Sequence, residues 1–143
     1  MSELTKIILT SSLTILGGVI IFSITRFVER FYIIPMDNLN KLRGQVSHKI
    51  ILHRNKFGNT NLTAEEKDEI SNDFRKLSSE LRSKVYLIKN YRLLSCLNLI
   101  LPREDVFVAS RELMGLSNSF FQDNQQKHDN RIEKIEKNLS IST

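Results

Sequence analysis

The sequence predicts an all-α protein in which one N-terminal transmembrane helix precedes a small helical bundle of about three helices. A long uncharged run opens the chain, and apolar residues then recur at helical spacing in three later stretches. Only 2 prolines and 5 glycines interrupt the 143 residues. Because these two residue types are the main helix breakers, their scarcity favours long regular helices.

The uncharged run extends from Ile7 to Thr25 and contains nineteen residues. Eleven of them are Ile, Leu, Val or Phe, and the others are Gly, Ser or Thr. Serine and threonine are tolerated in a spanning helix because their hydroxyls bond back to the helix backbone. At ~1.5 Å per residue the run covers about 28 Å, close to the ~30 Å hydrocarbon core of a bilayer. We therefore expect a transmembrane helix with an interfacial extension over residues 7–34.

Two other interpretations of this run are less well supported. A cleaved signal peptide would carry a small-residue cleavage site, but the text after the run is Phe22-Ser-Ile-Thr-Arg26. A buried core helix of a soluble domain is usually shorter than nineteen uncharged residues.

The charge distribution predicts the orientation of this helix. Residues 26–57 hold seven basic and two acidic side chains, whereas a single lysine precedes the run. Cytoplasmic flanks carry the excess of Lys and Arg, so we expect the N-terminus outside and the rest of the chain in the cytoplasm, at the cell inner membrane. The expected positive-inside anchors are Arg26, Arg30, Lys41 and Arg43. Since all the net charge of +5 lies in this flank, the lipid bilayer rather than nucleic acid is the expected partner.

The cytoplasmic domain is expected over residues 35–121, with helices over about 36–57, 64–92 and 103–121. Thr63 and Glu66 form a capping-box pattern at the start of the second helix. Pro35 either kinks the chain or starts a new helix. Gly44, inside the first helix, predicts close packing against a neighbouring helix.

Residues 122–143 are expected to form a polar tail that is flexible or contains a short helix at 131–139. No apolar residue occurs from Gln122 to Arg131. We expect this tail to order only with a partner, and it or the helical domain is a candidate protein-binding region.

Two segments are candidate contact sites. Thr10, Thr14 and Gly18 place small residues on one stripe of the membrane helix, a spacing that lets two helices approach closely and predicts a homo-oligomer. The apolar connection after the second helix is expected to return to headgroup level, because a turn at 58–61 makes that helix antiparallel to the first. The candidate membrane-surface residues are Leu93, Leu94, Leu97, Leu99, Ile100 and Leu101. Periodicity alone leaves open the alternative that this connection simply closes the base of the bundle.

No pattern of catalytic or metal-binding residues is present in the sequence. His48 and His53 are five residues apart, which does not place them on one helical face as metal ligands. Phosphate-binding glycine motifs are absent, and the single cysteine, Cys96, fits a reducing compartment. We therefore expect no catalytic residue, no metal and no cofactor.

Several phrases of the sequence form a pattern over residues 33–121. They are Ile33-Ile-Pro35, Leu42-Arg-Gly44, Leu81-Arg-Ser-Lys-Val-Tyr86, Pro102-Arg-Glu-Asp105, Ala109-Ser-Arg111 and Gly115-Leu-Ser-Asn-Ser119. The pattern resembles small uncharacterised bacterial proteins with one N-terminal membrane helix and a helical cytoplasmic domain. That resemblance implies a bacterial origin and brings no activity or catalytic residue with it.

Together these features favour a non-enzymatic interaction or scaffold module held at the cytoplasmic membrane face. The alternative is a membrane-acting effector or defence component that works by oligomerising in the bilayer. An enzyme is the third class, and no legible catalytic constellation favours it.

Overall fold

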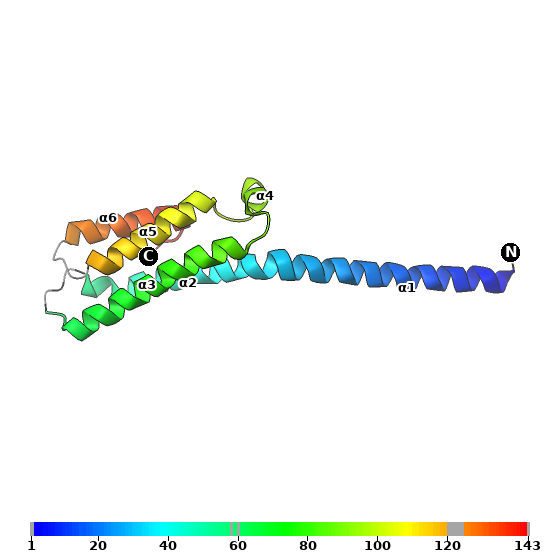
Figure 1. Ribbon diagram of the computed structural model, residues 1–143, viewed down its shortest axis with the longest axis horizontal. Helices are drawn as coiled ribbons and strands as arrows, with labels where there is room; N and C mark the ends of the chain where they lie inside the picture. Colours follow the sequence, from blue (N-terminus) through cyan, green and yellow to red (C-terminus); the bar gives the residue numbers. More distant parts are fainter. Residues whose placement is uncertain (1, 58, 60, 120–124, 143) are drawn as a thin grey trace. The chain divides into compact units, whose positions relative to one another are not determined.

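The computed structural model describes residues 2–57, 59, 61–119 and 125–142. Every regular element in these residues is helical, which confirms the all-α prediction. The elements are α1 (Glu3–Val28), the π-helical turn η1 (Glu29–Ile33), α2 (Ile34–His53), the 3-10 turn η2 (Arg54–Lys56), α3 (Ala64–Leu87), α4 (Tyr91–Cys96), α5 (Arg103–Ser119) and α6 (Gln125–Leu139) (Figure 1). The chain divides into two compact units, Met1–Ile34 and Pro35–Thr143, hereafter unit 1 and unit 2.

Unit 1 consists of α1 and η1. The Ser2 side chain caps α1 by accepting a hydrogen bond from the Thr5 N–H. Four hydroxyls of α1 donate to carbonyl oxygens four residues earlier, which satisfies them within the helix; they belong to Thr10, Thr14, Ser23 and Thr25. No residue of α1 is buried, and its sequence makes it long and apolar enough to cross a membrane.

Pro35 explains the π-helical turn that precedes α2. Proline has no N–H, so it cannot form the usual bond to the carbonyl four residues earlier. The Ile34 N–H instead bonds to the Glu29 carbonyl, five residues back, and the backbone at Val28 and Ile34 keeps right-handed helical angles. A wider turn therefore absorbs the bond that Pro35 cannot form.

Unit 2 is built around four long helices, α2, α3, α5 and α6, which lie side by side in Figure 1. α2 and α3 are antiparallel, because ion pairs join Lys49 to Asp73 and Lys56 to Glu66. The apolar spacing of each helix supplies one buried stripe, as expected for a bundle. The largest fully buried side chains are Phe74, Leu39, Ile50, Ile70, Leu81, Leu113, Leu116, Ile135 and Leu139.

Paired serines line the contact between α3 and α5. The Ser71 hydroxyl donates to the Ser117 carbonyl at 3.0 Å. One heptad away, the Ser78 hydroxyl donates to the Ser110 carbonyl at 2.7 Å and the Ser110 hydroxyl to the Ser78 carbonyl at 2.9 Å. Small side chains at seven-residue spacing on both helices let the two antiparallel backbones approach closely. The fourth hydroxyl, that of Ser117, donates to the Met114 carbonyl of its own helix, so every hydroxyl in this seam has a partner.

Glycines play different parts in α2 and α5. A Cβ built on Gly115 would lie 1.9 Å from Nη1 of Arg131, whose side chain crosses α5 to reach Glu112 at 2.8 Å. Gly44 is exposed, and a Cβ there would meet nothing within 4 Å. The expected close packing at Gly44 is therefore wrong, and Gly115 is the glycine where a neighbouring helix needs the space.

The polar C-terminal segment packs more extensively than its composition suggested. α6 begins at Gln125, not 131, and buries His128, Ile135 and Leu139 against α5 and the rest of the bundle. The Arg43 guanidinium of α2 donates to the Leu139 and Ser140 carbonyls, which joins the end of α6 to α2. Ordering only with a partner is thus wrong for residues 125–139, because a sparse apolar stripe suffices when α5 packs against it. Residues 120–124 and 143 lie outside the described residues.

The ends of α2 and α3 also differ from the expected ones. α2 gives way to the 3-10 turn η2 after His53, and α3 ends at Leu87, five residues before 92. Ile88 is extended and Asn90 takes a left-handed conformation with φ 53°, which reverses the chain. Asparagine tolerates this conformation better than most residues, so a new short helix, α4, starts where a continuation of α3 was expected.

Candidate functional site

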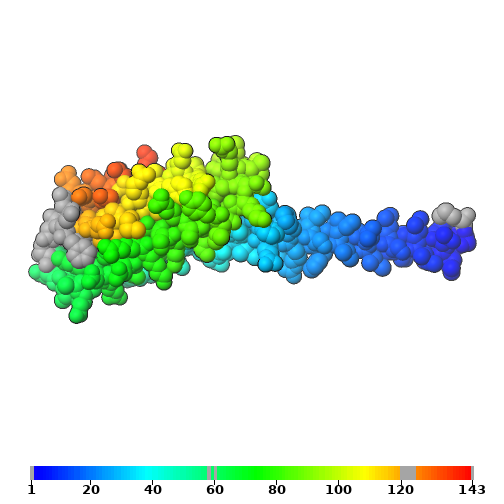
Figure 2. Space-filling model, in the orientation of Figure 1, coloured from blue at the N-terminus to red at the C-terminus, as the bar shows by residue number. Residues whose placement is uncertain are grey.

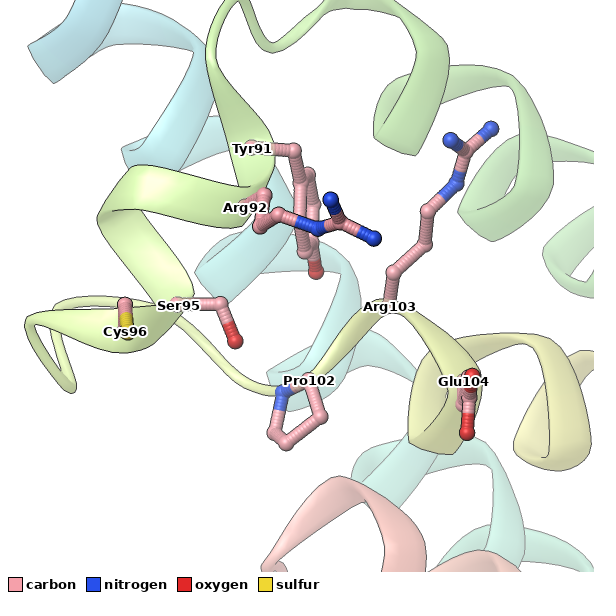
Figure 3. A pocket seen from close by; sticks show the side chains of 7 residues that line it. All are labelled: Tyr91, Arg92, Ser95, Cys96, Pro102, Arg103 and Glu104. Atoms are coloured by element: carbon pink, nitrogen blue, oxygen red, sulfur yellow. The ribbon is translucent and has the colours of Figure 1, made fainter.

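The connection between α3 and α5 forms an open pocket of about 500 Å³. It lies between α4 and the first turn of α5 (Figure 3). Its lining residues are Tyr91, Arg92, Ser95, Cys96, Pro102, Arg103 and Glu104.

Tyr91 and Leu94 hold α4 against the bundle, since both side chains are buried. The Tyr91 hydroxyl donates to the Leu101 carbonyl at 2.9 Å and so joins the start of α4 to the end of the connection. Burial raises the pKa of Tyr91 to about 12, so the phenol remains a neutral donor at physiological pH. This hydrogen bond fixes one wall of the pocket.

The leucine-rich segment that follows α3 divides into buried and exposed residues. Leu94 and Ile100 are 5% and 9% exposed and belong to the core, and Leu101 is half-buried. Leu93, Leu97 and Leu99 are 60%, 61% and 54% exposed. The segment therefore closes the bundle with some residues and presents others outward, and the contact of the exposed leucines with a membrane surface stays a prediction.

We define the α4 patch as Tyr86, Leu87, Leu93, Leu97 and Leu99. The described part of unit 2 exposes eight large apolar side chains, and these are five of them. Figure 2 shows α4, in yellow-green, standing out from the surface of unit 2. Because apolar exposure is concentrated on one short stretch, the α4 patch is a candidate contact surface.

The α4 patch lies within a basic stretch of unit 2. Residues 82–103 contain five basic side chains and no acidic one, whereas residues 35–143 as a whole carry a net charge of +4. The basic residues are Arg82, Lys84, Lys89, Arg92 and Arg103. Glu104 and Asp105 follow at once, in the first turn of α5, where acidic groups complement the helix dipole. The contact surface is therefore apolar and positively charged together.

Aromatic rings orient two of these arginines. The Arg103 guanidinium carbon lies 4.8 Å from the Tyr86 ring centroid and 5.0 Å from that of Phe107. The Arg82 guanidinium carbon lies 5.6 Å from the Phe107 ring. A guanidinium stacked on a ring keeps its in-plane N–H groups available for an acceptor. The sequence analysis missed this cluster, although i, i+4 spacing of Arg82 with Tyr86 and of Arg103 with Phe107 indicates each half of it.

The four expected positive-inside anchors have different surroundings. Arg26 pairs with Glu29 at 3.0 Å and Lys41 with Asp37 at 2.7 Å, both on the surface. Arg30 is exposed. Arg43 instead holds the end of α6, so its role in unit 2 is structural.

The expected helix-interface residues Thr10, Thr14 and Gly18 are all exposed on α1. The two threonine hydroxyls donate to backbone carbonyls of their own helix, at 2.8 and 2.9 Å. A Cβ built on Gly18 would meet nothing within 4 Å. The stripe therefore presents a small surface whose polar atoms are already satisfied.

Buried polar groups also lie at the η2 end of unit 2. His53 is 8% exposed, and its two ring nitrogens have no hydrogen-bond partner; its Nε2 lies 3.6 Å from Asp73 Oδ2. Burial and the nearby Lys49 lower the pKa of His53. Within the described residues no three His, Cys, Asp or Glu side chains gather as they would around a metal ion.

In comparisons with known proteins, no protein-family model, curated protein or solved structure matches the chain.

Proposed function

We propose that this chain is a membrane-anchored, non-enzymatic interaction module of the bacterial inner membrane. In this proposal α1 spans the bilayer with its N-terminus outside, unit 2 lies in the cytoplasm, and the α4 patch rests at headgroup level. Self-association through α1 brings copies of unit 2 together at the membrane face.

The observation that carries the proposal is the exposure of α1 on every side. Leu9, Ile15 and Ile21 are 60%, 68% and 68% exposed, although their six-residue spacing points them to three different faces of the helix. A core helix of a soluble protein buries at least one apolar stripe, and α1 buries none. The hydrocarbon core of a bilayer is the environment in which a helix with apolar residues on every face is stable.

The chain path supports the position of the α4 patch. α2 and α3 are antiparallel, so the start of α2 and the end of α3 lie at the same end of unit 2. That end carries α4, and it is also where the chain enters unit 2 after the apolar segment. Tyrosine, leucine and basic residues together suit the membrane interface.

The pocket residues favour a binding role over a catalytic one. Ser95 and Cys96 line the pocket without a histidine among the lining residues to activate them. The remaining polar groups are two arginines, a hydrogen-bonded tyrosine and one carboxylate. Such groups hold a ligand, whereas nucleophilic catalysis requires a base within hydrogen-bond reach of the nucleophile.

Membrane insertion and depth can be measured on the full chain. We expect resistance to alkaline extraction, and we expect Ile15→Arg to weaken it, because an arginine at a helix centre costs ~2.5–3.5 kcal/mol on the insertion scale.

A periplasm-dependent reporter fused after Thr143 should be silent. An environment-sensitive dye on the exposed Cys96 should be quenched by lipid-borne quenchers. Strong reporter activity would contradict the proposed orientation of α1. Quenching by aqueous agents alone would contradict contact between the α4 patch and the membrane.

A second candidate is a membrane-acting effector, which the small, exposed stripe on α1 favours. The two functions differ in their effect on the bilayer. A membrane-potential dye during induced expression should report an intact potential for the interaction module and a collapse for the effector.

A further inference from the structure

We propose that the pocket beside α4 binds the phosphate of an anionic phospholipid headgroup, with the α4 patch docking in the surrounding lipid. This inference rests on the proposed function, since it names the lipid that the membrane-facing end of unit 2 recognises. The first supporting feature is the pocket itself, which measures about 500 Å³ and opens beside exposed leucines. A cavity next to an apolar surface can take a polar headgroup while the leucines contact the lipid interface.

The donors at this pocket suit a phosphate. Arg92 and Arg103 line it from opposite sides, one from α4 and one from the first turn of α5. Neither guanidinium forms an ion pair with the part of the chain that the structure describes. Figure 3 shows the Arg92 side chain extending across the pocket toward the α5 side. Guanidinium groups bind phosphate through two parallel N–H donors, so a pair of them favours a doubly contacted anion.

Arg103 is held in place before any ligand arrives. Its guanidinium lies against both the Tyr86 and Phe107 rings, which contact each other with centroids 5.9 Å apart. This stacking limits the rotamers of a long side chain, so less conformational entropy is lost when it binds. Tyr86 also belongs to the α4 patch, which couples the pocket to the apolar surface.

The one carboxylate among the lining residues leaves this site with a net positive charge. Glu104 is exposed in the first turn of α5, and the two arginines outnumber it. Together with Arg82, Lys84 and Lys89, the two pocket arginines give residues 82–103 a charge of +5. An anionic bilayer surface attracts such a segment, whereas a zwitterionic surface attracts it weakly.

The test uses the full chain in proteoliposomes, with docking reported by Leu97→Trp. The chain has no tryptophan, so this substitution creates a single fluorophore at an exposed position of the patch. Brominated lipids quench it when the patch is docked. The measured quantity is the ratio of docked to undocked protein in pure phosphatidylcholine and in phosphatidylcholine with phosphatidylglycerol.

We expect phosphatidylglycerol to raise this ratio. In that lipid, Arg92→Gln with Arg103→Gln should lower it roughly 25-fold, at about fivefold per basic residue removed from an anionic surface. The matched control, Lys134→Gln with Lys137→Gln, removes the same charge from exposed positions of α6 and should change the ratio little. Inorganic phosphate at millimolar concentration should compete weakly, because it lacks the lipid contact of the leucines.

The outcomes separate the two proposals. If the pocket variant and the control variant give equal ratios, the proposed headgroup recognition is wrong. If both variants are still quenched, the docking of the α4 patch in the membrane is supported all the same. Suppose instead that inorganic phosphate abolishes quenching completely and that phosphatidylglycerol does not raise the ratio. The pocket then binds a soluble phosphate, and the proposed binding of a lipid headgroup is wrong. Absence of quenching in every lipid rejects the docked patch and, with it, this inference.

Discussion

Gly115 provides the space in which the Arg131 side chain crosses α5. A Cβ at position 115 would lie 1.9 Å from Arg131 Nη1 and 2.5 Å from its Cζ. The guanidinium cannot simply swing aside, because Nη1 donates to Glu112 at 2.8 Å and both side chains are largely buried. The contact between α5 and α6 therefore depends on a glycine within a helix, where glycine is otherwise unfavourable.

We predict opposite effects of two glycine-to-alanine substitutions. Gly115→Ala should lower the free energy of unfolding by about 1–3 kcal/mol, because the methyl group displaces the Arg131–Glu112 pair. Gly44→Ala should raise it by about 0.5–1 kcal/mol, since the position is exposed, helical and open around its Cβ. Urea unfolding of the full chain in detergent, followed by circular dichroism, measures both. A destabilised Gly44→Ala chain or an unchanged Gly115→Ala chain would contradict this account of the two glycines.

The serine seam between α3 and α5 should be sensitive to side-chain volume. Ser78→Val places a larger side chain where the two backbones are close and removes the bond from the Ser78 hydroxyl to the Ser110 carbonyl, so we expect a loss of about 2–4 kcal/mol. Ser78→Ala, which removes that bond alone, should cost about 0.5–1.5 kcal/mol. The neighbouring Ser79 is exposed, so Ser79→Val is the matched control and should change stability by under about 0.5 kcal/mol. Similar losses at both positions would show that valine acts through helix propensity and not through the seam.

His53 should make unit 2 less stable in mild acid. Burial lowers the pKa of His53 in the folded chain. Below pH 6.5, the unfolded value, the unfolded chain therefore binds a proton at His53 more readily than the folded chain does. The stability is therefore complete above pH 6.5 and falls as the pH drops below it. We expect His53→Gln to flatten the slope of unfolding free energy against pH between 7 and 5, whatever its effect at pH 7. His48→Gln, at an exposed position five residues earlier, is the control and should retain the wild-type slope.

Self-association should depend on the small stripe of α1. Gly18→Ile adds a branched side chain to that stripe and should lower the yield of crosslinked dimer in membranes, because the helix backbones can no longer approach. Gly17→Ile introduces the same side chain one residue away, on another face of the helix, and should leave the yield unchanged. Equal yields for Gly18→Ile and the unsubstituted chain would assign any oligomer to unit 2.

The sequence by itself determined the helical character of this protein and the existence of an apolar segment long enough to cross a membrane. Both follow from local properties: spacing of apolar residues, scarcity of breakers and length of the uncharged run. The capping box at Thr63 and Glu66 was equally local, and both of its hydrogen bonds are present.

Only the tertiary structure decided which residues of the bundle face one another. It divided the leucine-rich connection into core residues such as Leu94 and exposed residues such as Leu97, because burial depends on what the other helices cover. The tertiary structure also positions α6. The few apolar residues of this helix pack against α5, and Arg43 binds the carbonyl oxygen at its end, so α6 is stabilised by these contacts and not by helix propensity. The pocket beside α4 likewise exists because Asn90 reverses the chain and brings Arg92 opposite Arg103, a proximity that no spacing along the chain encodes.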